Sequence, residues 1–418
     1  MSAAAGVAGP LRLALVSYEF PPALAIGGIG TYSAQAARML AAAGVEVEVF
    51  CAGTPPPAGE PWAAPGLTIR RVSCSSREAF RTALAPVLAD RHRLAPFAVI
   101  ESPELAAEAA EAWVLCPGAA LVVRLHTPSE LLDELGWEPP SMVTRLRMLL
   151  GGFRRGRLVW ARPPAPSAEA DLERRFCAAA QLVVAPSQAI ADLCRRRWAL
   201  APSHLQVVPN VFRPAPALLA LTPPQQLITV GFLGRLETRK GIFDLAEAMA
   251  RLLPRHPGLR LRLIGPSWPT ARGDARQWLQ RRLQPWHDRV SLVGPVAADA
   301  VAAELARCDA VVLPSHWENF PNACWEAMAA ARMVVGSTAG GMAEVIRDGE
   351  DGLLVAPRRP SAIVAAIERL LAAPEPAAAM ALAARRRILD RLGDDTVLPL
   401  QLQAYRRAMA RHQGTGEP

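Results

Sequence analysis

Lysine is almost absent from this chain. Of its 46 basic residues, Lys240 is the one lysine and every other is arginine. This imbalance indicates an arginine-biased coding background, in which an arginine cluster by itself says little about function. The place of the single lysine is therefore the more informative feature. With 38 acidic residues the net charge is +8, which favours an acidic or phosphorylated partner.

Other absences limit the class of protein. The seven cysteines are odd in number and lack a C-x-x-C motif, which argues against disulfides or zinc and favours free thiols in the cytoplasm. No run reaches the ~18 apolar residues of a membrane span, and the first residues lack the basic stretch of a secretory signal. No basic stripe interleaved with aromatic residues is present, so we expect no nucleic-acid partner.

What is present is a globular composition, with 51% hydrophobic residues over 418 positions. Short β-branched runs alternate with helix-length segments, a pattern typical of parallel sheets covered by helices on both faces. The expected strands of a first series lie at 11–18, 46–52, 67–72, 97–102, 120–126, 182–187 and 205–210. A second series follows a proline-rich stretch, with strands at 227–235, 259–265, 289–294, 309–315, 333–338 and 352–357.

The chain is therefore expected to form two doubly wound α/β domains in tandem. We assign the N-terminal domain to 1–212, a linker to 213–226, the C-terminal domain to 227–375 and a helical tail to 376–418. Ligands of such sheets bind outside the carboxyl ends of the strands, so two facing domains place the ligand in the cleft between them. The tail could pack back across the N-terminal domain.

The lone lysine lies in the segment VGFLGRLETRKGIFDL at 230–245. Arg235 follows the expected strand, and Lys240 lies just before Gly241, where a helix begins. Two cations at a strand end beside a helix N-terminus suit a diphosphate. The alternative is that both cations are solvated surface residues.

A second candidate segment is LPSHWENFPNACWEAM at 313–328. Glu318 lies in the loop after an expected strand, and Pro321 is predicted in the first turn of the following helix, which carries Glu326. The helix N-terminus adds partial positive charge to the cleft. Because the two glutamates are eight residues apart, we expect them to contact different hydroxyl-bearing parts of one ligand, although Glu326 could be an ordinary surface acid.

Two N-terminal features complete the candidate site. The loop at 27–30 contains Gly27 and Gly28, with Thr31 as the expected N-cap, and it does not match the G-x-G-x-x-G dinucleotide pattern. His126 ends an expected strand and is either structural or part of the site.

Residues 136–170 fit the alternation poorly. This stretch sets Arg145, Arg147, Arg154, Arg155 and Arg157 among leucines and methionines. It is either an interfacial amphipathic segment that meets an anionic membrane through 145–157 or an arginine-rich surface helix.

Taken together, these motifs resemble those of family 4 glycosyltransferases, which are retaining enzymes of the GT-B fold that use nucleotide-sugar donors. The resemblance rests on G-R-L-x-x-x-K-G at 234–241, on E-x7-E from Glu318 to Glu326, and on STAGGMAEVIRDGEDGLLV at 337–355. It implies a fold of two Rossmann-like domains facing each other across a cleft, with the acceptor on the N-terminal domain and the donor on the C-terminal domain. One departure is VPNVFRP at 208–214, where the family commonly has glycine and aspartate after Asn210.

The resemblance also implies a role for each candidate residue. Arg235 and Lys240 would hold the donor diphosphate, Glu318 the sugar hydroxyls and Glu326 the ribose hydroxyls. Gly27 and Gly28 would close over the diphosphate, and His126 would line the reacting centre. The remaining donor-binding positions would be Asn319, Phe320, Pro321, Asn322 and Ala323.

We therefore expect a retaining sugar transfer from a UDP- or GDP-sugar to a hydroxyl acceptor, such as a glycan, a lipid-linked saccharide or a small metabolite, as in polysaccharide biosynthesis. The resemblance favours front-face attack, in which a donor phosphate oxygen takes the acceptor proton. No D-x-D motif occurs, so we expect no metal and no cofactor. The alternatives are a nucleotide-sugar epimerase of similar fold and an inactive nucleotide-sugar-binding subunit. The expected location is cytoplasmic, with a peripheral membrane contact as a further option.

Overall fold

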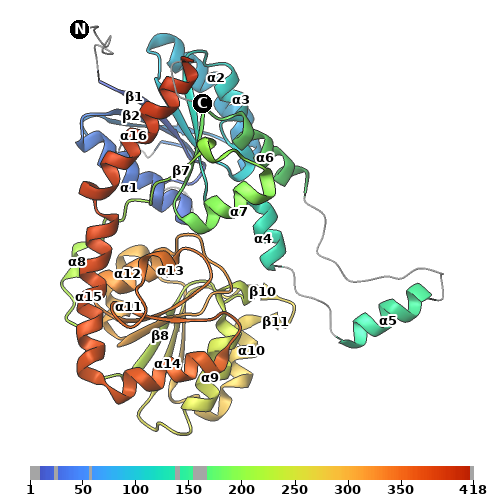
Figure 1. Cartoon of the computed structure of the whole chain (residues 1–418), viewed down its shortest axis with the longest axis vertical. Helices are drawn as coiled ribbons and strands as arrows, with labels where there is room; N and C mark the ends of the chain where they lie inside the picture. The colour runs from blue at the N-terminus through green and yellow to red at the C-terminus, as the bar shows by residue number, and fades with distance from the viewer. Residues whose placement is uncertain (1–9, 23–26, 56–58, 137–141, 154–166, 415–418) are drawn as a thin grey trace.

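The structure is a computed structural model that describes residues 10–22, 27–55, 59–136, 142–153 and 167–414. Two α/β domains lie one above the other along the long axis of the molecule (Figure 1). Blue-to-green segments form the upper, N-terminal domain, yellow-to-orange segments form the lower, C-terminal domain, and the red C-terminal helix lies along the upper domain. Among the described residues, no helix has the length and apolar character needed to span a membrane.

In the described residues, the N-terminal domain contains a seven-stranded sheet in the order β3-β2-β1-β4-β5-β6-β7, with parallel pairing throughout. The central strands are buried along their whole length, because helices cover both faces. The strands are β1 (Arg12–Val16), β2 (Glu46–Ala52), β3 (Leu67–Val72), β4 (Val99–Pro103), β5 (Ala120–Arg124), β6 (Leu182–Ala185) and β7 (Leu205–Val207). The helices are α1 (Gly28–Ala42), α2 (Arg77–Leu94), α3 (Ala110–Val114), α4 (Ser129–Gly136), α5 (Met142–Phe153), α6 (Ala168–Ala179) and α7 (Gln188–Trp198).

The C-terminal domain contains a parallel six-stranded sheet, again within the described residues, in the order β12-β9-β8-β13-β14-β15. Its strands are β8 (Thr229–Leu233), β9 (Arg260–Ile264), β12 (Val290–Gly294), β13 (Ala310–Leu313), β14 (Met333–Ser337) and β15 (Leu353–Val355). A short antiparallel hairpin, β10 (Pro269–Thr270) with β11 (Gly273–Asp274), follows β9. The helices are α8 (Pro216–Leu219), α9 (Ile242–Leu252), α10 (Ala275–Arg282), α11 (Val301–Ala306), α12 (Asn322–Ala329), α13 (Met342–Val345) and α14 (Pro360–Ala372). Every strand segment predicted from the sequence overlaps one of these thirteen parallel strands, and only β4 extends beyond its segment, by one residue, which confirms the two doubly wound sheets.

The C-terminal tail divides between the two domains. Helix α15 (Pro374–Leu392) packs into the core of the C-terminal domain, whereas α16 (Asp394–His412) packs on the N-terminal sheet. The two red helices run along one side of the molecule and join the domains (Figure 1). Leu218 in the expected linker and Phe212 just before it are both buried in the C-terminal core.

A buried polar cluster fastens α16 to the N-terminal sheet. Arg124 on β5 and Glu101 on β4 form an ion pair with an Nε–Oε1 distance of 3.0 Å, and both side chains are 1% exposed. Glu101 also accepts hydrogen bonds from Gln401 at 2.8 Å and from Tyr405 at 2.7 Å, both on α16. On the other side it accepts from Tyr32 of α1 at 2.5 Å. Because all four acceptor positions of the carboxylate are used, this ion pair is buried without an unsatisfied lone pair.

Two local predictions are wrong. Helix α1 begins at Gly28 with Gly27 as its N-cap, and the hydroxyl of Thr31 donates back to the carbonyl of Gly27 instead of capping the helix. Gly27 takes the N-cap position because its backbone N–H donates to the Glu19 carboxylate at 2.9 Å. Pro321 is the N-cap of α12, one position before the first turn predicted for it.

Candidate active site between the two domains

Lys240 is held at the carboxyl end of β8 by a short helical turn, Thr238–Lys240. The next residue, Gly241, has a φ of 71°, and a Cβ there would lie 2.1 Å from the carbonyl oxygen of Pro314. Only glycine permits this close approach of the turn to the end of β13. The consequence is that Lys240 lies beside the loop that carries Glu318.

Lys240, which we expect to bind the diphosphate, and Glu318, which we expect to bind the sugar, contact each other in this structure. The ammonium of Lys240 forms an ion pair with the Glu318 carboxylate, and Arg239 lies 3.1 Å from the same carboxylate. Burial raises the pKa of Glu318, but Lys240 and Arg239 outweigh it, so the pKa lies below its usual value and the group is ionised. Burial also lowers the pKa of Lys240, and Glu318 offsets part of that effect. A donor that binds here must share or exchange these contacts.

Arg235 occupies the flank of the same site. Its side chain is 42% exposed, lies 3.3 Å from Glu237 and has its guanidinium 5.2 Å from the ring centroid of Trp268. Stacking on the indole restricts the arginine while leaving its N–H groups open to an anion. Arg235 and Lys240 together therefore present two cations at the carboxyl edge of the C-terminal sheet.

Glu326 lies on α12 in an apolar environment. Burial raises its pKa to about 7. At its side, Trp325 is fully buried and packs edge-to-face against Phe320, with 5.1 Å between ring centroids. Asn322 and Ala323 in the first turn of α12 are half-buried. A ligand hydroxyl that donates to Glu326 would favour its ionised form.

Asn319 connects the loop that carries Glu318 to His126 in the other domain. Its side-chain amide donates to the carbonyl oxygen of His126, and its side-chain oxygen accepts from Ser187 at 2.8 Å. The loop is packed so tightly that a Cβ on Gly340 would lie 1.9 Å from the Glu318 carbonyl oxygen. The two candidate segments of the N-terminal and C-terminal domains are thus directly hydrogen-bonded to each other.

His126 is neutral in this environment. Burial, with further contributions from Arg124 and Arg77, lowers its pKa to about 3. Its backbone N–H donates to both oxygens of Glu104 at 2.8 Å, and its ring packs edge-to-face on Tyr32 with 5.6 Å between centroids. Burial raises the pKa of Glu104 well above its usual value, with the nearby Glu173 adding to the effect. A neutral imidazole can accept or donate one hydrogen bond, so it suits contact with a hydroxyl group.

Two family models match this chain. The model described as "Glycosyltransferase Family 4" matches residues 26–215, and the model described as "Glycosyl transferases group 1" matches residues 228–373. The D-inositol 3-phosphate glycosyltransferase of Actinosynnema mirum is 30% identical over 383 residues, which covers 83% of this chain and 84% of that protein. The chain belongs to glycosyltransferase family 4.

Solved structures of related fold agree with the two-domain architecture. The sucrose-phosphate synthase of Thermosynechococcus elongatus superposes with a TM-score of 0.73 at 23% identity and covers 96% of this chain and 99% of that one. Anabaena HepE in complex with UDP superposes with a TM-score of 0.64 at 20% identity and covers 94% and 98%. The fold of this glycosyltransferase is GT-B, as the sequence motifs predicted, and its activity falls within the glycosyl-transferring class EC 2.4.

Several residues of the candidate site could not be selected from the sequence. Arg239 was indistinguishable from the other arginines, and Glu104 carried no motif. Glu344 of α13 accepts the backbone N–H groups of Gln188 and Ala189 at 2.7 Å each, at the start of α7 in the other domain. Ser187, the N-cap of α7, gave a local capping signal but no hint of its contact with Asn319. All four lie at contacts between segments far apart in the chain.

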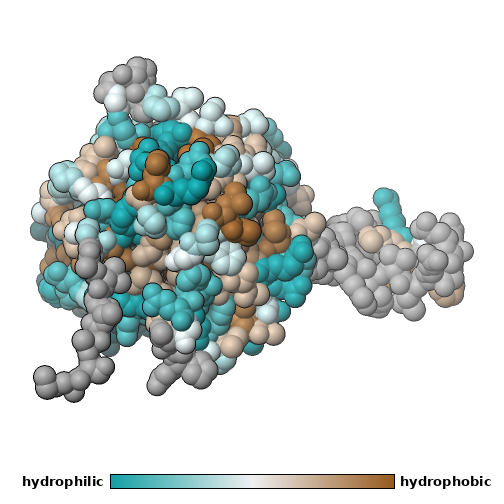
Figure 2. Space-filling model, turned by 90° about the horizontal axis from the view of Figure 1, so that it is seen from above, coloured by the Kyte–Doolittle hydropathy of each residue, from teal (hydrophilic) through white to brown (hydrophobic). Residues whose placement is uncertain are grey.

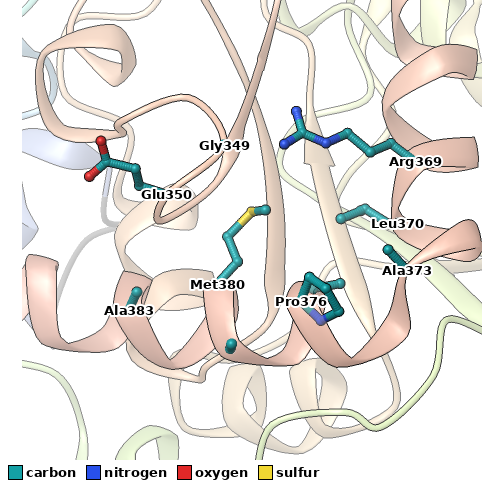
Figure 3. Close-up of a pocket in the computed structure, with 10 residues that line it drawn as sticks. Gly349, Glu350, Arg369, Leu370, Ala373, Pro376, Met380 and Ala383 are labelled. Carbon is teal, nitrogen blue, oxygen red and sulfur yellow. The ribbon is translucent and has the colours of Figure 1, made fainter.

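A separate cavity of about 420 Å³ lies away from this site. Figure 3 shows Leu370 on one helix, and Ala373 just after its end, facing Met380 on the next helix, with Gly349 and Glu350 of a loop beside them. That loop precedes β15, so it lies at the amino edge of the parallel sheet, opposite the donor residues. We assign the cavity no part in sugar transfer.

Proposed function

We propose that this protein transfers a sugar from a nucleoside diphosphate sugar to a hydroxyl acceptor with retention of the anomeric configuration. The observation that carries the proposal is the group formed by Lys240, Arg239 and Glu318 beside Arg235, which is hydrogen-bonded through Asn319 to His126. It brings cations for a diphosphate and a carboxylate for sugar hydroxyls next to a histidine of the opposite domain. These are the components that a transfer between two domains requires.

Charge stabilisation is the main catalytic task in this proposal. When the bond between the sugar and the diphosphate breaks, negative charge grows on the leaving diphosphate. Arg235 and Lys240 can stabilise that charge, and so can the N-terminus of α12 at Phe320–Ala323. Buried cations stabilise it more strongly than solvated ones, because less water screens them. With positive charge supplied by these groups, we propose that no metal ion is needed.

His126 and Glu318 position the sugar in this proposal. The neutral imidazole offers one hydrogen bond to a sugar hydroxyl, and the ionised Glu318 carboxylate accepts from others. A donor phosphate oxygen takes the proton of the acceptor hydroxyl during front-face attack. Glu326 accepts hydrogen bonds from the ribose.

The nucleotide that we test first is UDP. Anabaena HepE, a protein of the same fold, is described in complex with UDP and with UDP-glucose. GDP-sugars are the second group, because both nucleotides present the same diphosphate to Arg235 and Lys240. The seven thiols are all free, in keeping with a reducing compartment such as the cytoplasm.

The proposal is tested with a panel of UDP- and GDP-sugars and a mixture of saccharide, lipid-linked and small polyol acceptors. We expect one nucleotide to raise the melting temperature by mass action. Free nucleotide diphosphate should appear only when an acceptor is added, and NMR should show the anomeric configuration of the donor in the product. Inversion would refute the retaining mechanism, epimerised donor would favour an epimerase, and binding without turnover on any acceptor would favour an inactive subunit.

We further propose that α5 contacts an anionic membrane. The helix stands apart from both domains (Figures 1 and 2), and Leu146, Leu150 and Phe153 share one face and are 59%, 57% and 85% exposed. Arg147 is exposed beside them, as an interfacial helix requires. The predicted partners Arg154, Arg155 and Arg157 lie outside the described residues, and of Arg145 only the backbone is described.

This contact is tested by sedimentation with vesicles. The wild type should bind vesicles that contain phosphatidylglycerol and not vesicles of phosphatidylcholine alone. The variant Leu150→Ser/Phe153→Ser should lose most of that binding. Leu382→Ser is the matched control, because Leu382 is a 37% exposed leucine on α15 in the other domain. Equal binding of both variants would refute the role of α5.

A further inference from the structure

The order of the N-terminal strands marks the place for an acceptor. Strands β2 and β3 follow β1 on one side, and β4 to β7 lie on the other, so the order reverses between β1 and β4. Ligands of doubly wound sheets bind at the carboxyl ends of the strands at such a switch point. Here the residues that follow these two strands are Tyr18 and Glu19 after β1, and the segment from Glu104 to Glu108 after β4.

Arg77, the first residue of α2, fills this switch point and has both of its guanidinium ends engaged. One terminal nitrogen lies 2.7 Å from Glu19, and the other pairs with Glu108. The guanidinium also lies 4.7 Å from the ring centroid of Tyr18, whose backbone N–H donates to Glu108 at 2.7 Å. A bidentate arginine of this kind is a usual phosphate ligand, but here two carboxylates already occupy it.

The neighbouring arginines of this edge are also engaged. Arg71, at the end of β3, has a side chain that is 1% exposed and pairs with Glu60 at 2.9 Å. Arg81 on α2 pairs with Glu111 at 3.0 Å and donates to the carbonyl of Ala106 at 3.1 Å. Each of the three arginines described at this edge is therefore bonded to a carboxylate.

The edge carries little or no net positive charge. Burial raises the pKa of Glu108 to about 7 despite its contact with Arg77. His126 is neutral, and Arg71 and Arg81 are balanced by Glu60 and Glu111, so the charge of Arg77 is the one left to balance. Glu19 balances it, with a further contribution from Glu108. Glu19 also accepts the N–H of Gly27, which fixes its carboxylate beside the glycine loop. An entering phosphate dianion would meet the Glu19 carboxylate and would have to displace it from Arg77, which is unfavourable at short range.

We infer that the acceptor of this enzyme is an uncharged polyol ring, a saccharide or cyclitol without a phosphate beside the reacting hydroxyl, and that Glu19 and Glu108 impose this choice by neutralising Arg77. The inference rests on the proposed glycosyl transfer. The contrast with the proposed donor side supports it, because three cations, Arg235, Arg239 and Lys240, share only two carboxylates there, Glu237 and Glu318. An uncharged acceptor would also differ from D-inositol 3-phosphate, the compound for which relatives of this chain are named.

The test compares matched acceptors: myo-inositol with myo-inositol 3-phosphate, and glucose with glucose 6-phosphate. Turnover is followed as nucleotide release from the donor identified in the nucleotide-sugar panel, or from UDP-glucose. Binding of each acceptor to the UDP-saturated protein is measured by calorimetry. We expect the wild type to prefer the unphosphorylated member of each pair in both measurements.

The decisive variant is Glu19→Gln, which removes the charge and keeps an oxygen for the Gly27 N–H. It should shift the preference toward the phosphorylated acceptor by about tenfold or more, which corresponds to about 1.4 kcal/mol. Glu108→Gln should shift it in the same direction and is the second variant if the first fails to fold. Glu46→Gln breaks an ion pair of the same domain, Arg12 with Glu46 at 3.0 Å, at the opposite, amino end of the sheet, and it should leave the preference unchanged.

The outcomes separate the inference from the proposed function. A wild type that prefers phosphorylated acceptors in turnover or in binding overturns the inference. An unchanged preference in both glutamine variants overturns the assignment to Glu19 and Glu108. Absence of nucleotide release with every acceptor counts against the transferase proposal, and the binding preference still decides the inference.

Discussion

Replacing Lys240 with alanine separates the proposed donor-binding role of this residue from its part in stability. In the free protein the lysine pairs with Glu318, which keeps Arg239 as a second partner at 3.1 Å. Loss of one of two cationic partners should lower the free energy of unfolding by about 1–2 kcal/mol. Breaking the pair outright would cost more, about 3–5 kcal/mol, because an unpaired buried carboxylate would remain.

The effect of Lys240→Ala on donor binding should be larger. Two unit charges about 4 Å apart at an effective dielectric constant of about 20 attract each other by about 4 kcal/mol. Replacement of water contacts reduces that gain, so we expect the Kd for UDP to rise about 100- to 1,000-fold. Calorimetric titration with UDP at 0.15 M salt measures the change, and urea unfolding of the free protein measures the stability.

A matched control isolates the role of the site. Arg255→Ala removes a cation of the same domain that pairs with Glu368 and is 50% exposed, so it should change neither UDP binding nor stability appreciably. A folded Lys240→Ala protein that binds UDP within about threefold of the wild type would refute the assignment of the diphosphate to this residue.

Three further predictions follow from other contacts. The pKa of Glu326 lies near 7 in the folded state and lower when unfolded, so its ionisation destabilises the protein as the pH rises through 5–7. In urea unfolding, Glu326→Gln should therefore be more stable than the wild type by about 1–3 kcal/mol at pH 8 and equal to it at pH 4. The same variant should bind UDP-sugar more weakly. Glu344→Ala removes both hydrogen bonds to α7, so small-angle scattering should show a larger radius of gyration, and kcat should fall. Glu101→Leu leaves Arg124 buried without its carboxylate and should lower the free energy of unfolding in urea by about 3–5 kcal/mol, whereas Tyr405→Phe should cost about 1–2 kcal/mol.

The fold was predictable because its signals are local. Each parallel strand is a short β-branched run with helix-length segments around it, so this alternation located all thirteen that the described residues form. The start of α1 was misplaced because a distant carboxylate, Glu19, binds the Gly27 N–H and replaces the local Thr31 cap. The segment that forms α5 does not follow the alternation of strands and helices. Its amphipathic pattern therefore left open both an interfacial segment and an arginine-rich surface helix.

The meeting of the candidate site residues was predictable where they follow strand ends. Arg235, Lys240 and Glu318 each lie after a strand of the same parallel sheet, and the carboxyl ends of such strands meet at one edge. Gly241 and Gly340 explain why that edge is so compact, since a Cβ at either position would collide with the neighbouring backbone. Arg239 could not be selected from the sequence, because nothing local distinguishes it from the other arginines.

The sequence by itself determined the family, the two parallel sheets and the unusual place of its lone lysine, because these depend on residue type and short-range spacing. Tertiary structure alone decided the pairings: Lys240 with Glu318, Asn319 with His126, and Arg77 with Glu19 and Glu108. The physical reason is that charge neutralisation and pKa depend on which groups the fold buries side by side. The net charge of +8 suggested an acidic partner. The fold sets three cations against two carboxylates around Lys240, whereas in the other domain it pairs Arg77 with both Glu19 and Glu108.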